Sequence, residues 1–128
     1  MRPSVLIDSH GWIEYFSGGP LAGKYAEHIE AANKQNSITP SIIIYEVYKR
    51  IKSLKGESSA LEAIAHIVEH TTIVQIDDRT ALNAAEISLK TKLAMADAMI
   101  KAVAEAWKSK IITGDPHFRG FPDVVFVC

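Results

Sequence analysis

Four acidic residues stand in apolar surroundings along this chain: Asp8, Glu46, Asp97 and Asp115. Asp8 and Asp115 each come at the end of a short run of β-branched residues, whereas Glu46 and Asp97 interrupt the apolar stripes of predicted helices. An acid beside a protein core is unfavourable unless something compensates its charge. A bound divalent cation would compensate all four together, because hard cations prefer carboxylate oxygens. The four acids therefore predict a metal-dependent enzyme.

The chemistry expected of such a site is hydrolysis of a phosphate ester. Crowded carboxylates raise one another's pKa, and a divalent cation reverses this effect. All-oxygen sites suit Mg²⁺ or Mn²⁺, and the sequence has no pairs of cysteine or histidine spaced for a structural zinc. One or two such ions polarise a phosphoryl oxygen and activate a water for in-line attack. No side chain is an evident nucleophile, since Ser9 has no base at a recognisable spacing.

The composition indicates one ordinary globular domain over residues 1–128, with 48% apolar residues. The net charge of −1 gives no global attraction to nucleic acid, so binding of a polyanion requires a local patch. The single cysteine, Cys128, cannot form an internal disulfide, which fits a reducing cytoplasm. No apolar run approaches the roughly 18 residues of a membrane span. We therefore expect a cytoplasmic protein that contacts no membrane.

Short apolar segments alternate along the chain with amphipathic ones. We predict strands at 4–7, 36–39, 72–76, 110–113 and 124–127. We predict helices at 9–16, 21–34, 40–54, 58–70, 78–90 and 94–108, and a turn or short helix at 115–118. The strands are continuously apolar, which indicates an α/β fold with a parallel sheet of about five strands, covered on both faces. Thr39 and Pro40 are expected to be the N-cap and the first residue of the third helix.

These elements bring the acids toward one edge of the sheet, where parallel α/β proteins place their functional crevice. Asp8 and Asp115 follow the first and fourth strands, Glu46 lies about two turns into a helix, and Asp97 lies in a first helical turn. Singly, Asp8 suits a helix cap, Asp97 the helix dipole and Asp115 a turn. Glu46 has only a salt bridge on its own helix as an alternative. Their joint spacing favours the metal site.

The segments that contain the acids are Val5-Leu6-Ile7-Asp8-Ser9, Tyr45-Glu46-Val47, Ala96-Asp97-Ala98-Met99-Ile100 and Ile112-Thr113-Gly114-Asp115-Pro116-His117-Phe118. In order, spacing and context they resemble the PIN domain, and more closely the VapC-type toxins of prokaryotic toxin–antitoxin pairs. The resemblance implies a three-layer α/β/α fold. It also implies an endoribonuclease that hydrolyses RNA phosphodiester bonds with Mg²⁺ or Mn²⁺. Such toxins are usually homodimers that a cognate antitoxin protein holds inactive.

The resemblance assigns a role to individual residues of this chain. The implied acidic metal site consists of Asp8, Glu46, Asp97 and Asp115. Thr113 would orient the acidic groups or a metal-bound water, and Ser9 would lie at the floor of the pocket.

Two places depart from the pattern of the family. His10-Gly11 follows the first acid, where a small polar residue and an apolar one are more common. Gly114 stands where a basic or polar residue is common. We expect Gly11 to weaken the first helix and Gly114 to remove a contact with the substrate phosphate.

Basic and aromatic residues near the acids have two readings each. The basic stretch consists of Lys49, Arg50, Lys52 and Lys55. It is either a solvated helix face or a rim that grips RNA phosphates beside Glu46, with Lys49 and Arg50 as the candidate contacts. The aromatic residues are Trp12, Tyr15, Phe16 and Tyr48. They either pack in the core or contact an antitoxin helix or a second subunit.

The segment 66–70, His-Ile-Val-Glu-His, matches the inverted zinc-peptidase motif H-x-x-E-H. We expect a chance match, because the predicted core stripe of this helix would turn His66, Glu69 and His70 toward solvent. That stripe consists of Leu61, Ile64, Ala65 and Val68. A catalytic zinc also needs a third ligand, and none is evident in the sequence.

Other acids and other functions are weaker candidates. Asp77-Asp78 is explained as a helix cap, and Glu86 is either an accessory acid of the pocket or a solvated side chain. The alternative functions are a PIN-type RNA-processing nuclease without an antitoxin and a catalytically silent binding module. A phosphoacceptor domain would need an acidic pair at the first strand end, and Asp8-Ser9 does not supply one.

Overall fold

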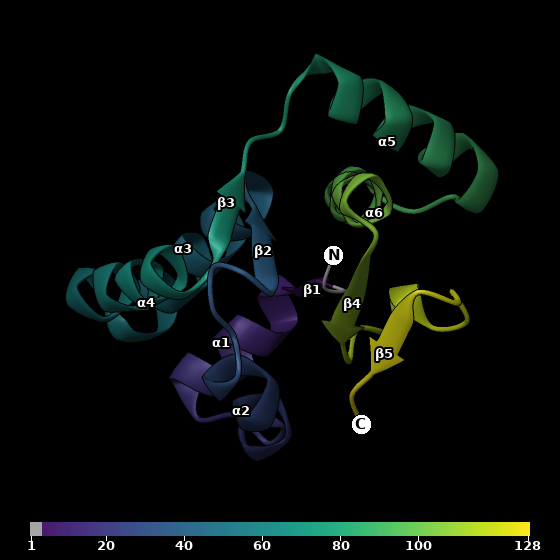
Figure 1. Cartoon of the computed structure of the whole chain (residues 1–128). Helices are drawn as coiled ribbons and strands as arrows, with labels where there is room; N and C mark the ends of the chain where they lie inside the picture. The colour runs from purple at the N-terminus through teal and green to yellow at the C-terminus, as the bar shows by residue number, and fades with distance from the viewer. Residues whose placement is uncertain (1–3) are drawn as a thin grey trace.

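A five-stranded, entirely parallel sheet organises the protein, and its strand order is β3-β2-β1-β4-β5 (Figure 1). The computed structural model describes residues 4–128. The strands are β1 (Ser4–Ile7), β2 (Ser37–Pro40), β3 (Thr72–Val74), β4 (Ser109–Thr113) and β5 (Val124–Phe126). The predicted three-layer α/β/α fold with a parallel sheet of about five strands is confirmed.

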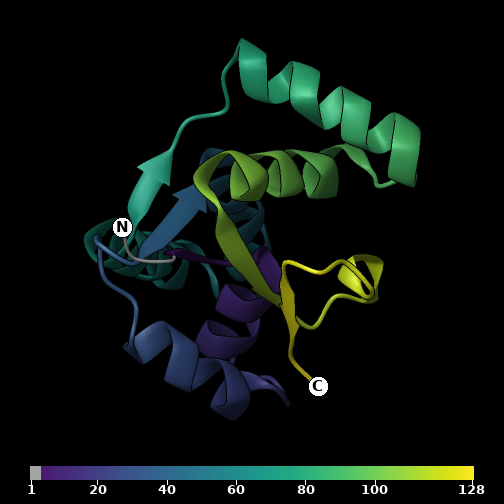
Figure 2. The ribbon, with the colours of Figure 1, turned by 45° about the vertical axis from the view of Figure 1, so that its right-hand side comes forward.

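Helices pack on both sides of this sheet, with α1 and α2 on one side and α5 and α6 on the other (Figures 1 and 2). The helices are α1 (Ser9–Ser17), α2 (Ala22–Glu30), α3 (Ser41–Lys55), α4 (Glu57–His70), α5 (Asp78–Thr91), α6 (Met95–Trp107) and the 3₁₀ turn η1 (Pro116–Phe118). The predicted bounds differ most at α2, which ends at Glu30 instead of residue 34. The Asn33 side chain accepts from the backbone of Gln35 and Asn36, and such local bonds compete with a helix.

The three central strands β2, β1 and β4 form the buried part of the sheet. Leu6 of β1 pairs with Ile38 of β2 and with Ile111 of β4, and all three side chains are buried. Full burial of one such side chain stabilises the fold by roughly 1.5–3 kcal/mol. The segments that follow β1 and β4 therefore start from rigid, well-packed strand ends.

The start of α3 differs from the prediction. Pro40 is the last residue of β2 and occupies the N-cap position without a side-chain hydrogen bond. The expected capping role of Thr39 is wrong, because its buried hydroxyl hydrogen-bonds the hydroxyl of Thr71 at 2.7 Å. This bond ties the strand to the end of α4 instead.

The predicted core stripe of α4 is also wrong. Leu61 and Val68 are 52% and 44% exposed, and the buried residues of the helix are Ala60, Ala63 and Ile67. His66 is consequently half-buried, 5.5 Å from the Phe16 ring between centroids, and does not point into solvent as expected.

The zinc-peptidase motif finds no support in this arrangement. The Nδ1 atom of His70 forms a hydrogen bond with the His66 carbonyl oxygen at 2.8 Å. Within residues 4–128, the single group of three side chains that could hold a metal ion lies elsewhere and includes neither histidine. The chance match stays a prediction.

Within residues 4–128, no helix has both the length and the apolar character needed to cross a membrane.

Candidate active site

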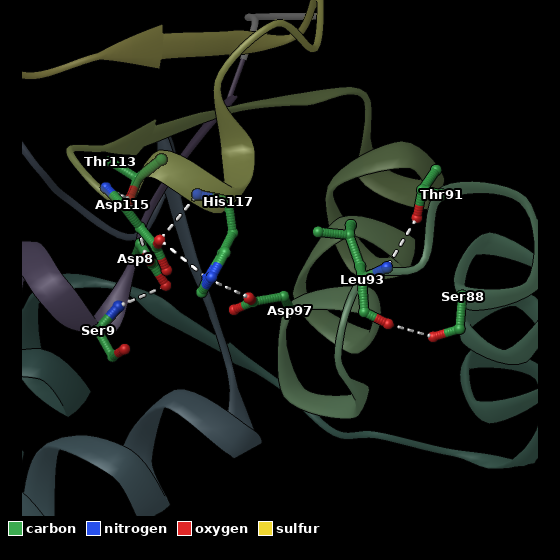
Figure 3. A network of polar contacts seen from close by, with 9 residues as sticks. All are labelled: Asp8, Ser9, Ser88, Thr91, Leu93, Asp97, Thr113, Asp115 and His117. Carbon is green, nitrogen blue, oxygen red and sulfur yellow. Dashed lines mark hydrogen bonds and ion pairs between the residues drawn. The ribbon is translucent and has the colours of Figure 1, made fainter.

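The four predicted acids lie at the carboxyl edge of the sheet and at the helix turns beside it. Asp8 directly follows β1, and Asp115 follows the neighbouring strand β4 (Figure 3). Glu46 lies in the second turn of α3, and Asp97 in the first turn of α6. The carboxylates are close enough to influence one another: Glu46 and Asp97 raise the pKa of Asp8, and Asp115 raises the pKa of both Glu46 and Asp97. The fold therefore brings all four acids within electrostatic reach of one another, while only Asp97 and Asp115 belong to the compact group of possible metal ligands among residues 4–128.

Asp8 is the most buried of the four, with 2% of its surface exposed. Its Oδ1 accepts the Ser9 backbone N–H at 2.8 Å, and its Oδ2 accepts the Thr113 hydroxyl at 2.9 Å. Burial raises the pKa of Asp8 to about 7, and these two hydrogen bonds lower it only in part. A cap role alone does not explain a carboxyl group held so unfavourably.

Thr113 is fully buried and connects the first acid to the last one. Its hydroxyl donates to Asp8 and accepts the backbone N–H of Asp115 at 3.0 Å. The Asp115 side chain in turn accepts the backbone N–H of His117 at 2.9 Å and caps η1. The side chain of Thr113 thus orients both the Asp8 carboxylate and the backbone that carries Asp115.

Glu46 is half-buried, and its one hydrogen-bonding neighbour among residues 4–128 is the Ser9 hydroxyl. Its pKa is raised by burial first and then by Asp97 and Asp115, while the Ser9 hydroxyl lowers it. Its Oε1 atom is buried without a hydrogen-bond partner among residues 4–128. Within the same residues it forms no ion pair with Lys49 or Arg50, whose side chains are exposed. The salt-bridge alternative is therefore wrong.

Asp97 and Asp115 face a third side chain, His117 (Figure 3). The His117 Nδ1 atom lies 3.4 Å from Asp97 Oδ2 and 3.1 Å from Asp115 Oδ1. One ligand atom from each of the three residues lies within 4.8 Å of the others. The pKa of Asp97 is raised by burial and by Asp115, whereas His117 lowers it.

The loop between α5 and α6 sets the position of Asp97. The Ser88 hydroxyl donates to the Leu93 carbonyl at 2.8 Å, and the Leu93 N–H donates to the Thr91 hydroxyl at 3.2 Å (Figure 3). A pocket of about 260 Å³ opens here, with this loop on one wall and Asp97 and His117 on the other.

Two residues of the site region were missed in the sequence, His117 and Tyr25. His117 had a signal, since it stands two residues after Asp115 in a segment that turns back. Tyr25 had none: its hydroxyl contacts the Gly114 N–H at 2.6 Å across 89 residues of sequence. Burial raises the pKa of Tyr25 to about 12.

The remaining sequence candidates have ordinary positions. Asp77 caps α5 as predicted, because its Oδ1 accepts the Thr80 N–H at 2.9 Å. Glu86 is exposed on α5 and is not an acid of the pocket. Trp12 is fully buried and is a core residue. The other three predicted aromatic residues, Tyr15, Phe16 and Tyr48, are half-buried.

The residues present fit a divalent cation. The donors are carboxylate oxygens with one adjacent imidazole nitrogen, a set that suits Mg²⁺ or Mn²⁺. Burial and mutual repulsion raise the pKa of Asp8, Glu46 and Asp97, and positive charge at their centre would relieve both effects. The unpartnered Oε1 of Glu46 is a free donor atom at this place.

A parallel α/β domain with an acidic cluster at its carboxyl edge is the class that fold and site define. The chain belongs to the PIN domain family, which matches residues 5–124. No curated protein sequence matches the chain significantly.

Several solved structures of toxin–antitoxin proteins are similar to this chain. A toxin–antitoxin complex from Klebsiella pneumoniae contains a chain 27% identical, with a TM-score of 0.78, covering 95% of this chain and 96% of that one. DNA-bound VapBC from Salmonella typhimurium has a TM-score of 0.79 at 15% identity, covering 99% and 100%. VapC20 from Mycobacterium tuberculosis, described as a toxin that cleaves the sarcin–ricin loop, has a TM-score of 0.75 at 17% identity, covering 94% and 98%. The predicted resemblance to the PIN domain and to VapC toxins is confirmed.

Proposed function

We propose that this protein is a metal-dependent endoribonuclease and the toxin component of a type II toxin–antitoxin pair. The observation that carries the proposal is the convergence of Asp8, Glu46, Asp97 and Asp115, with the pKa of the first three raised. Membership in the PIN domain family and 27% identity to a chain of a toxin–antitoxin complex support it.

In the proposed mechanism the four acids would hold Mg²⁺ or Mn²⁺. When bound, the cation would polarise a phosphoryl oxygen of RNA and lower the pKa of a nearby water. Thr113 keeps the Asp8 carboxylate and the Asp115 backbone in place through its two hydrogen bonds. Glu46 would accept a proton from the attacking water, because its Oε1 atom has no hydrogen-bond partner within residues 4–128.

RNA contacts would come from Lys49 and Arg50, which are exposed on the same helix as Glu46, and from Ser9, which is half-buried next to Asp8. A local basic rim is needed because the net charge of the chain is −1. The cognate antitoxin, a homodimeric state and a cytoplasmic location are part of the same proposal.

The test is RNA cleavage with Mn²⁺, in the presence and absence of a chelator. Asp8→Asn and Asp97→Asn should lower the cleavage rate by about 100-fold or more, because each removes a cation ligand. Glu86→Gln is the matched control, since it neutralises an exposed carboxylate outside the site. Cleavage by both aspartate variants at the wild-type rate would show that the proposed site is wrong.

Further measurements distinguish the toxin from two related functions, an RNA-processing nuclease and a catalytically silent binding module. Inhibition of cleavage by the product of an adjacent reading frame supports the toxin, whereas its absence favours an RNA-processing nuclease. Mn²⁺ binding without cleavage of any RNA would indicate a silent binding module.

A further inference from the structure

Three residues near the acids, His10, Gly11 and Gly114, lie against one side chain, Tyr25. Tyr25 belongs to α2, is fully buried and reaches the loop between Thr113 and Asp115. None of these four residues was assigned a role in cation or substrate binding above. Their common contact indicates one shared structural purpose.

The hydrogen bond between Gly114 and the Tyr25 hydroxyl has a defined direction. A backbone N–H can only donate, so the phenol oxygen accepts from Gly114 at 2.6 Å. The phenol hydrogen is then available to His10 Nδ1, which lies 2.8 Å away.

Glycine is required at both contact positions because of close approach. A Cβ atom at position 11 would lie 2.6 Å from Tyr25 Cε1, and one at position 114 would lie 2.6 Å from the Val127 carbonyl oxygen and 3.3 Å from the Tyr25 hydroxyl. Contacts under 3.0 Å force the backbone or the ring to move. The missing side chain at Gly114 therefore admits the Val127 carbonyl oxygen, and it leaves room for the Tyr25 hydroxyl beside the same peptide.

We propose that Tyr25 is a positioning residue for the cation site. It holds the Gly114 peptide from one side, while Thr113 holds the next N–H, that of Asp115, from the other. Together they fix the Asp115 carboxylate relative to Asp8. The proposal rests on the proposed metal site, and it goes beyond that site in assigning the control of its geometry to α2.

The test is Tyr25→Phe, which removes the hydroxyl and keeps the buried ring. The dissociation constant of Mn²⁺, measured by electron paramagnetic resonance, should rise about 10-fold, as is usual when the partner of a ligand is lost. Excess Mn²⁺ should restore kcat, with KM for RNA unchanged. Tyr15→Phe is the matched control, since the Tyr15 hydroxyl has no hydrogen bond to residues 4–128 and its Mn²⁺ affinity should stay at the wild-type value.

Amide hydrogen exchange separates this local role from a general loss of stability. In Tyr25→Phe, the Gly114 and Asp115 amides should exchange about 10-fold faster, while the Leu6 amide in the central strand keeps its rate. Gly114→Ala should weaken Mn²⁺ binding in the same way. Uniformly faster exchange would show a merely structural tyrosine, and an unchanged Gly114 rate with unchanged Mn²⁺ affinity would also overturn the positioning role.

Asp97→Asn distinguishes the two proposals. Loss of Mn²⁺ binding in Asp97→Asn together with wild-type binding in Tyr25→Phe overturns only the role of Tyr25. Absence of Mn²⁺ binding in the wild-type protein overturns the proposed function itself.

Discussion

Replacing Asp8 by asparagine should stabilise the metal-free protein above neutral pH. The Asp8 carboxyl group is 2% exposed, and burial raises its pKa from 3.8 to about 7. A group with a raised pKa in the folded state contributes its full stability below the unfolded pKa, and this contribution is lost as the pH rises through the folded value. Metal-free wild-type protein should therefore lose stability between about pH 4 and pH 7.

The size of the effect follows from the pKa shift. One pKa unit corresponds to about 1.4 kcal/mol, so ionised Asp8 lowers the free energy of unfolding by roughly 4 kcal/mol above pH 7. Asparagine removes this penalty, but its amide nitrogen replaces the Oδ2 atom that accepts the Thr113 hydroxyl, a loss of about 1–2 kcal/mol. The variant should therefore be more stable by about 2 kcal/mol near pH 8. Near pH 5 the two terms should roughly cancel, because only part of the wild-type penalty is present there.

The assay is urea unfolding with a chelator present at about pH 5 and about pH 8. With a denaturant slope of about 2 kcal/mol per molar, the midpoint of Asp8→Asn should rise by roughly 1 M at the higher pH and stay unchanged at the lower one.

Asp77→Asn is the control for this assay. Hydrogen bonds from the Thr80 N–H and hydroxyl lower the pKa of Asp77, so its loss should not stabilise the protein at either pH. A lower midpoint for Asp8→Asn near pH 8 would refute the reasoning and make this carboxylate an ordinary helix cap. Added Mn²⁺ should reverse the order, since it binds the wild-type carboxylate more tightly than the amide.

Three further expectations concern the proposed nuclease. Glu46→Gln should lower kcat by about 100-fold with little change in KM, because it removes a proton acceptor; an unchanged kcat in single-turnover cleavage would exclude that role. Lys49→Ala combined with Arg50→Ala should raise KM for RNA and reduce its dependence on salt, measured from about 50 to 200 mM; an unaltered salt slope would assign both side chains to solvent. His117→Ala should weaken Mn²⁺ binding by about 10-fold and Mg²⁺ binding less, because nitrogen ligands favour transition metals. Calorimetric titration checks this, and equal losses for both ions would show that His117 is not a ligand.

Local patterns in the sequence were sufficient to predict the parallel sheet and to select the four acids. Continuously apolar strands have no solvent-facing side, so they imply a covered parallel sheet, and this sheet is present. The carboxyl ends of adjacent parallel strands lie at one edge, so the meeting of Asp8 and Asp115 follows from topology. Glu46 was the most informative acid because its position has no cap or turn role, and the structure leaves its Oε1 without a partner in the described chain.

Patterns in the sequence could not predict which face of each helix is buried. In α4 several choices of apolar face are compatible with the sequence, and a shift by one residue turns the face by about 100°. Packing of Ala60, Ala63 and Ile67 decided the choice, and small alanines were selected over Leu61 and Val68 because they allow close approach to α3. The same rotation placed His66 beside the Phe16 ring.

The sequence by itself therefore determined the elements, the sheet and the group of acids, since each depends on periodicity or on the order of strands. Only the tertiary structure decided how the acids are held. The contact of Tyr25 with Gly114 joins residues 89 apart, and His117 meets Asp97 only because η1 turns back toward α6. Contacts of this kind form only when packed elements are placed to within a few tenths of an ångström of one another. No pattern along the chain specifies such positions. In the sequence Gly114 only lacked a side chain for a phosphate contact, whereas in the structure it admits the Val127 carbonyl oxygen and donates its N–H to the Tyr25 hydroxyl.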